Sequence, residues 1–211
     1  MTRILSTRTL NTLRSADLIT PARKLAAAPQ LAPTDTFEAP KKVSTVRDDG
    51  DGFDPGTNKV IDLANSVMGE NAADLKVAND TDLGDAMQDW VPNNVNCANF
   101  VSGLLTATGQ IPKEEGSAGV VNLVNNLRDD PNFTEVSLDD ASPGDVVAFE
   151  YGSGKKKGHH VVVFEGRDEN GNPKFIGSDN VNPDKSQRIN RSTGVRSGRR
   201  ILAVMHYSKD D

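Results

Sequence analysis

The sequence predicts an α+β domain that follows an N-terminal tail. Apolar residues recur at helical spacing from about residue 57 to residue 130, whereas short strand-like apolar runs dominate after residue 135. The first 55 residues are rich in Thr, Ser, Ala, Pro and Arg, a composition typical of chain that packs no core. We therefore assign residues 1–55 to a flexible tail or an export and docking segment, and residues 56–211 to the folded domain.

Composition argues against several classes of protein, including nucleic-acid-binding and membrane-spanning proteins. The 211 residues include one cysteine, so no internal disulfide is available, and the net charge of −6 argues against general nucleic-acid binding. No apolar run reaches the ~18 residues of a membrane span, and no continuous apolar segment of a standard signal peptide follows the N-terminal arginines. We interpret the acidic segment at 48–54 as a polar turn, and we predict no metal or cofactor site.

Two helices are predicted before the cysteine. The first begins at Thr57 or Asn58 and ends at Gly69. The second is short, covers about residues 80–90 and ends near Trp90, because Pro92 breaks it. The apolar face of the first helix consists of Val60, Ile61, Ala64, Val67 and Met68.

The central helix is predicted to begin at the lone cysteine, Cys97. Asn94 and Asn96 are capping residues, and Gly109 ends the helical run. Cys97 is therefore expected in the first turn, where unpaired N–H groups and the positive end of the helix dipole favour a thiolate. The other interpretation of a lone cysteine is a small buried core residue. The apolar positions of this helix are Phe100, Val101, Leu104 and Leu105.

A further helix and a set of strands follow. We expect Ser117 to cap the helix and Asp130-Pro131 to close it, and the strands to form an antiparallel sheet in which His206 is structural. The turn Asn170-Gly171-Asn172-Pro173 joins two of the strands into a hairpin. The inward residues of the helix are predicted to be Val120, Val121, Val124 and Leu127. The strands are predicted at residues 136–138, 146–149, 160–166, 174–177 and 201–207.

A thiol nucleophile needs a base within hydrogen-bond reach and a third group that orients the base. His159 and His160 stand at the head of one predicted strand. Alternation puts them on opposite faces, so only one of them can face Cys97, and spacing does not choose between them. The next strand ends in Asp179 and Asn180, and either side chain would hold the imidazole in one tautomer.

Four blocks of sequence stand in a recognisable order. They are Asn96-Cys97-Ala98, Pro143–Val147, Gly158–Gly166 and Ile176–Asn180. This order resembles that of the NlpC-type cell-wall cysteine peptidases and the related CHAP amidases, over about residues 90–207. Two positions depart from those families, which usually have Asp-Cys-Ser at the nucleophile and in some NlpC members a histidine where Gly177 stands. The resemblance implies a papain-like fold, with N-terminal helices packed on a small antiparallel sheet.

The resemblance also implies roles for individual residues. In those families the catalytic histidine directly precedes a Val-x-x run, which points to His160 as the base for Cys97. Their third polar residue ends the following strand, often as asparagine, and CHAP proteins often carry a glutamate five residues after the histidine. We therefore assign Cys97, His160, Asn180 and Asp179 to catalysis, and His159, Asn96 and Glu165 to substrate binding.

The function that the resemblance implies is hydrolysis of an amide bond in peptidoglycan stem peptides. We expect export by a non-Sec route, as an antibacterial effector of type VI secretion with an immunity protein as partner, or as a phage-type lysin. The site of action would be the periplasm or cell wall of a target bacterium. Two alternatives are a papain-like deamidase or protease that acts on a host protein, and a non-catalytic binding module. Basic residues that suit the carboxylates of a stem peptide are Lys155–Lys157, Lys185, Arg188, Arg191, Arg196, Arg199 and Arg200.

Overall fold

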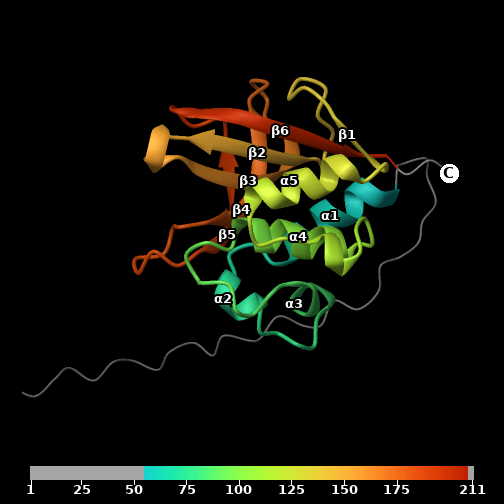
Figure 1. The fold of residues 1–211 in the computed structure, drawn as a ribbon, viewed down its shortest axis with the longest axis vertical. Helices are drawn as coiled ribbons and strands as arrows, with labels where there is room; N and C mark the ends of the chain where they lie inside the picture. Colours follow the sequence, from blue (N-terminus) through green and yellow to red (C-terminus); the bar gives the residue numbers. More distant parts are fainter. Residues whose placement is uncertain (1–54, 209–211) are drawn as a thin grey trace, which may run out of the picture. The chain divides into compact units, whose positions relative to one another are not determined.

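A computed structural model describes residues 55–208, in which helices pack on one face of a six-stranded antiparallel sheet (Figure 1). The α+β class predicted from the sequence is thereby confirmed. The tail assigned to residues 1–55, apart from Pro55, and the acidic segment at 48–54 lie outside the described residues. No helix within residues 55–208 combines the length and apolar character that crossing a bilayer requires.

The sheet is built by antiparallel pairing between neighbouring strands. Their spatial order is β1-β6-β2-β3-β4-β5, so the last strand in the chain enters between the first two. β3 and β4 form the predicted hairpin, and β2 pairs with β3 and β6 in the middle of the sheet. The strands are β1 (Phe133–Glu135), β2 (Val146–Tyr151), β3 (Gly158–Arg167), β4 (Pro173–Asp179), β5 (Arg188–Thr193) and β6 (Arg199–Tyr207).

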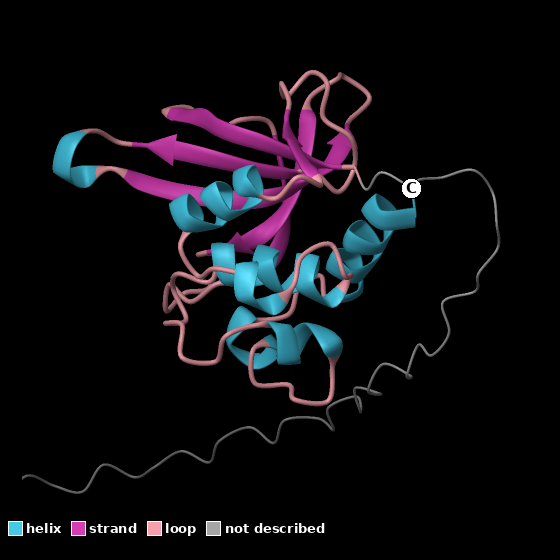
Figure 2. Cartoon of the chain, turned by 45° about the vertical axis from the view of Figure 1, so that its right-hand side comes forward, coloured by secondary structure: helices cyan, strands magenta, loops and turns pink. Residues whose placement is uncertain are grey.

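The helices lie along one side of the sheet (Figure 2). The central helix, α4, contacts β3 and β4 on one side and α1, α3 and α5 on the others. Its side chains are buried from Cys97 to Leu105, and Gly109, with φ of +76°, ends the turn that follows. The helices are α1 (Pro55–Ser66), α2 (Ala72–Leu75), α3 (Asp82–Ala86), α4 (Cys97–Ala107) and α5 (Val120–Asp129), with single 3₁₀ turns η1 (Lys113–Glu115) and η2 (Gly154–Lys156).

The sheet separates two apolar layers. The larger layer joins the helices to residues such as Val161, Val163 and Ile176. The smaller layer, on the opposite face, holds three phenylalanines in edge-to-face contact and is covered by the loop at 136–141. The side chains of the smaller layer are Val147, Phe149, Val162, Phe164, Phe175 and Val204.

Several element boundaries differ from the predictions. The first helix begins at Pro55. Proline is favoured in the first turn because the N–H that it lacks would have no hydrogen-bond acceptor within the helix there. The strand expected at 136–138 lies at Phe133–Glu135, because Phe133 pairs with Tyr207 of β6 while the predicted residues cover the smaller layer. In α5, Val121 is exposed and Leu123 is fully buried, so the inward face was predicted wrongly at one position.

Candidate active site

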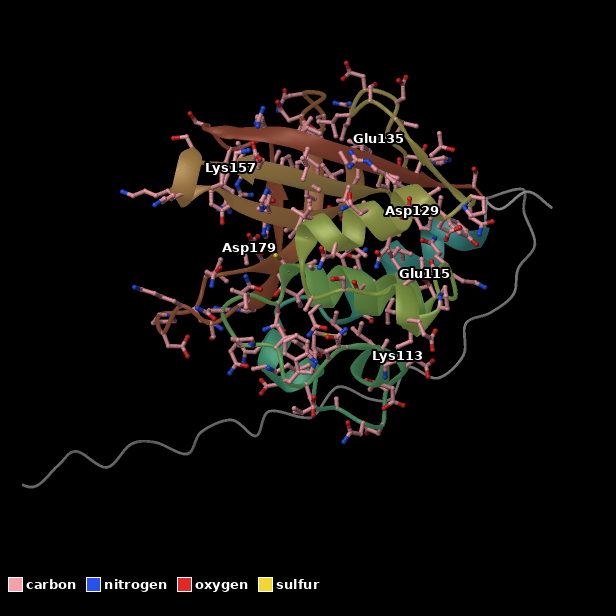
Figure 3. All side chains as sticks on the ribbon, viewed as in Figure 1. Lys113, Glu115, Asp129, Glu135, Lys157 and Asp179 are labelled. Atoms are coloured by element: carbon pink, nitrogen blue, oxygen red, sulfur yellow. The ribbon has the colours of Figure 1, made fainter. Side chains whose placement is uncertain are left out.

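The lone cysteine, one histidine and one aspartate come together where α4 meets the sheet. Cys97 opens α4, and His160 lies near the start of β3. Asp179 ends β4 and is labelled in Figure 3. His160 Nε2 lies 3.0 Å from Asp179 Oδ1, at ion-pair distance but without the angle of an ideal hydrogen bond. A side-chain hydrogen bond between His160 and Cys97 contributes to the raised pKa of the histidine. All three residues are buried, with 6–7% of their surface exposed.

The pairing of β3 with β4 explains why His160 meets Asp179. Val163 lies opposite Ile176 and Phe164 lies opposite Phe175. Continuing this antiparallel pairing toward the start of β3 brings His160 across from Asp179.

The local charges stabilise an imidazolium at this position. Burial disfavours the charge on the His160 ring, but hydrogen bonds to Asp179 and to Cys97 outweigh it and raise the pKa of His160 to about 8. Burial also disfavours the Asp179 carboxylate, yet His160, Arg196 and Arg199 hold the pKa of Asp179 below its ordinary value. The ring is therefore mostly protonated at neutral pH and faces a sulfur at a helix N-terminus.

The neighbouring histidine belongs to a separate cluster. His159 Nε2 lies 3.6 Å from Glu150 Oε2, and Glu150 is also paired with Lys157 and Arg200. Hydrogen bonds from Lys157 and Arg200 lower the pKa of Glu150 to about 2. The structure therefore brings His160, and not His159, to Cys97. His159 lies beside Glu150 rather than beside Cys97, and the substrate-binding role predicted for it stays a prediction.

Asn180 has a place beside the site rather than in it. Its Nδ2 donates to the carbonyl oxygens of Asn94, at 2.9 Å, and of Lys185, at 2.6 Å. Its Oδ1 accepts a bond of 3.0 Å from Gln187, whose Oε1 accepts from Ser178. The structure thus places Asp179, and not Asn180, against His160. Asn180 joins the loop before Cys97 to the loop after β4.

The turn that carries Cys97 is supported by two buried asparagines. Asn96 Nδ2 donates to the Pro92 oxygen at 2.8 Å, and Asn96 Oδ1 accepts from Asn99 at 3.0 Å. Asn99 also bonds both the N–H and the C=O of Gln88. Asn96 occupies the N-cap position of α4, as expected, but its fully buried side chain makes no capping hydrogen bond. Its bonds hold the turn in place. The substrate-binding role predicted for it stays a prediction.

Two other predicted residues lie away from the sulfur. Glu165 stands five residues along β3 from His160, about 16 Å at the ~3.3 Å rise of a strand. It is bound by Arg191, at 2.6 Å, and Lys174, at 3.8 Å. The structure therefore separates Glu165 from the site. His206 Nδ1 lies 2.8 Å from Asp145 Oδ1, a pairing consistent with the structural role expected for it.

Gly177 is a position where the chain has no room for a side chain. A Cβ atom there would lie 2.6 Å from Val162 Cγ1, well inside van der Waals contact. The histidine that some NlpC proteins carry at this point would therefore collide with β3. Asp179 is the polar group of β4 that approaches His160 in its place.

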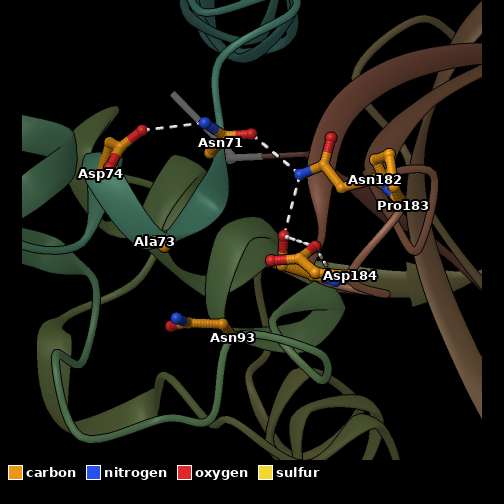
Figure 4. Close-up of a pocket in the computed structure, with 8 residues that line it drawn as sticks. Asn71, Ala73, Asp74, Asn93, Asn182, Pro183 and Asp184 are labelled. Atoms are coloured by element: carbon orange, nitrogen blue, oxygen red, sulfur yellow. Dashed lines mark hydrogen bonds between the residues drawn. The ribbon is translucent and has the colours of Figure 1, made fainter. Parts of the chain in front are cut away.

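An open pocket adjoins the loop before Cys97 (Figure 4). Its volume is about 470 Å³. Asn182 Nδ2 bridges its walls by donating to Asn71 Oδ1 and to Ser186 Oγ, both at 2.9 Å. The pocket is lined by Asn71, Ala73, Asp74, Asn93, Asn182, Pro183, Asp184 and Ser186.

Residues that the sequence did not single out support the site. Gln187 is buried and connects Ser178, Asn180 and the backbone of Asn93, whose oxygen accepts from the Gln187 N–H at 2.9 Å. No pattern in the sequence pointed to Gln187, because β5, the strand that it precedes, was not predicted. In the part of the chain that the structure describes, no three His, Cys, Asp or Glu side chains are grouped to hold a metal ion.

Comparison with known proteins gives no match. No family model matches the chain, and no curated protein and no solved structure is significantly similar to it.

Proposed function

We propose that residues 55–208 form a papain-like cysteine hydrolase that cleaves an amide bond in peptidoglycan stem peptides. One observation carries the proposal. A cysteine at the N-terminus of a buried helix is hydrogen-bonded to a histidine, and that histidine lies 3.0 Å from a buried carboxylate. This is the nucleophile, base and orienting group that thiol catalysis of acyl transfer requires.

Each residue has a role in the proposed reaction. The Cys97 thiolate attacks the amide carbon, and the S–C bond forms as the carbonyl oxygen becomes an oxyanion. The Cys97 backbone N–H, in the first helical turn where no intrahelical acceptor exists, would donate to that oxyanion. His160 then gives its proton to the leaving amine, and the C–N bond breaks. In the second half His160 takes a proton from water, which attacks the acyl-enzyme and releases the acid and the thiolate.

The choice of stem peptides depends on the resemblance described above and on charge. The positive charges of Arg196 and Arg199 help to lower the pKa of Asp179, so both side chains lie within electrostatic range of the site. Stem peptides carry free carboxylates, which such side chains would attract. The proposal places the protein's work in the periplasm or wall of a target bacterium, with delivery by type VI secretion or by phage-type lysis.

The test is digestion of purified peptidoglycan, with mass spectrometry of the fragments released. The matched pair is His160→Ala and His159→Ala, because these neighbours lie on opposite faces of β3. We expect defined fragments from the wild type and from His159→Ala, and a loss on the order of 10⁴-fold or more in Cys97→Ala and His160→Ala. Wild-type turnover by folded Cys97→Ala would rule out the mechanism.

The same experiment separates the alternatives. A wild-type protein that releases no wall fragments, but whose Cys97 is alkylated far faster than a free peptide thiol, would favour a deamidase or protease with a protein substrate. A wild-type protein that releases no fragments and reacts like a free peptide thiol would favour a non-catalytic binding module.

A further inference from the structure

Arg199 lies over two aromatic rings beside the candidate site. Its guanidinium carbon lies 5.8 Å from the centroid of Phe149 and 5.7 Å from that of Tyr151. Tyr151 is the cross-strand partner of Arg199 in the pairing of β2 with β6. A cation–π contact restrains a guanidinium without using its N–H groups, which stay available for hydrogen bonds.

The same rings connect Arg199 to the catalytic histidine. Phe149 lies directly opposite His160 in the pairing of β2 with β3. The Arg199 charge interacts with those of Asp179 and Cys97, so the cation is within electrostatic range of the nucleophile. Gly158 allows this arrangement, because a Cβ atom there would lie 2.4 Å from the Tyr151 ring.

A second arginine, Arg196, adds to the positive charge beside Arg199. Burial and the nearby Arg196 charge both lower the pKa of Arg199. Within residues 55–208, neither Arg196 nor Arg199 forms an ion pair, although Arg191 and Arg200 each bind a glutamate. The two like charges repel each other, and the Asp179 carboxylate that lies in range is already paired with His160. A bound carboxylate would relieve that repulsion.

We propose that Arg199, with Arg196, binds a free carboxylate of the substrate next to the scissile amide. The proposal rests on the proposed function, because it takes Cys97 as the nucleophile. It names the substrate class as amides that carry a carboxylate within reach of the bond cleaved. It also separates Arg199 and Arg196 from the other basic residues, since Arg188 and Arg191 lie in β5 and Arg200 is paired with Glu150.

The test uses two alkylating probes that differ in charge. In each, the Cys97 sulfur attacks the CH₂ carbon, the S–C bond forms, and the C–I bond breaks to release iodide. Iodoacetate carries a carboxylate beside the reacting carbon, whereas iodoacetamide is neutral. The measured quantity is the ratio of the two alkylation rates, which cancels changes in intrinsic thiol reactivity and needs no knowledge of the natural substrate.

We expect Arg199→Gln to lower the iodoacetate-to-iodoacetamide ratio about tenfold, and Arg196→Gln to lower it by a smaller factor. The matched control is Arg200→Gln, which removes the same charge from the adjacent, exposed position and should change the ratio less than twofold. If circular dichroism shows that Arg199→Gln is unfolded, Arg196→Gln and Arg199→Lys decide the matter, the latter with a ratio between those of Gln and wild type.

Equal ratios in wild type and both Gln variants would overturn the carboxylate site, as would an equal fall in Arg200→Gln, which would show only a general charge effect. Failure of the wild type to cleave peptidoglycan would overturn the proposed function but leave the rate ratios unaffected. The two proposals therefore fail by different measurements.

Discussion

His160 Nε2 and Asp179 Oδ1 lie 3.0 Å apart on neighbouring strands, and both side chains are buried. Asp179 and Cys97 together raise the pKa of His160 to about 8 against the effect of burial, so the ring is mostly protonated at neutral pH. The pH dependence of any activity at Cys97 should therefore report on a carboxylate that never touches the substrate.

Asp179→Asn should move the alkaline limb of the pH profile. In the wild type kcat/KM should fall as pH rises through about 8, where His160 loses its proton. Removing the Asp179 charge removes a cause of the raised pKa of His160, so the limb should move to lower pH, with a loss of about 10- to 100-fold near neutral pH. The measurement is kcat/KM from pH 5 to pH 10.

Asn180→Ala is the control for that experiment. Its side chain bonds the loops and not His160, so the alkaline limb should stay where it is even if the variant is less stable. A limb that moves in Asn180→Ala and stays fixed in Asp179→Asn would reverse the assignment of the third residue.

His160 should stabilise the fold more at low pH than at high pH. Its pKa of about 8 in the folded state lies above the 6.5 of an ordinary histidine, so its contribution is fully present below pH 6.5 and is lost as pH rises through 8. The shift corresponds to about 2 kcal/mol. Urea unfolding of wild type and His160→Gln at pH 6 and pH 9 should show the difference between them shrinking by that amount. A difference that grows with pH would contradict the cause given for the raised pKa.

Gly177→Ala should destabilise the sheet through one contact. The added Cβ would lie 2.6 Å from Val162 Cγ1, so β3 and β4 must move apart, at a cost of about 1–3 kcal/mol in unfolding free energy. Val162→Ala removes the colliding atom. The double variant should therefore be more stable than the sum of the two single changes predicts, as measured by urea unfolding. Simple additivity would show that the collision is not the cause.

His206→Phe should destabilise the fold without affecting the thiol. Asp145 is 1% exposed, and burial raises the pKa of its carboxyl. Hydrogen bonds with Ser142 and His206 lower that pKa but do not outweigh burial. Loss of His206 leaves the buried carboxylate with one fewer partner, at about 1–3 kcal/mol. The rate of Cys97 alkylation by iodoacetamide should stay within twofold of wild type. Adding Asp145→Asn should recover part of the stability, and its failure to do so would show that the carboxylate is not the source of the loss.

The regular elements of this fold could be predicted where one apolar face decided the local structure. The helix that starts at Cys97 and the hairpin of β3 and β4 were both predicted from apolar spacing and turn residues, and the structure confirms them. β5 was missed because Ile189 is its only buried residue, and the arginines around it were interpreted only as basic residues that suit a carboxylate. An edge strand with one buried side chain leaves too weak a pattern to detect.

The residue types of the site could be predicted from the sequence more readily than the geometry that brings them together. Cys97 and the His159–His160 pair followed from the rarity of their residue types, but the choice of His160 depends on which face of β3 meets α4. The choice between Asp179 and Asn180 depends on strand register, because a shift of one residue exchanges them. Register is set by long-range pairing such as Val163 with Ile176, which no local pattern encodes.

The carboxamide of Asn180 ties together two loops that are 86 residues apart in the chain. Together with Gln187 it braces the turn from which Cys97 projects. A protease cut or a deletion between residues 181 and 186 would therefore weaken the support of the turn that carries Cys97. The thiol would then lose its fixed orientation, although the strands of the sheet would stay paired.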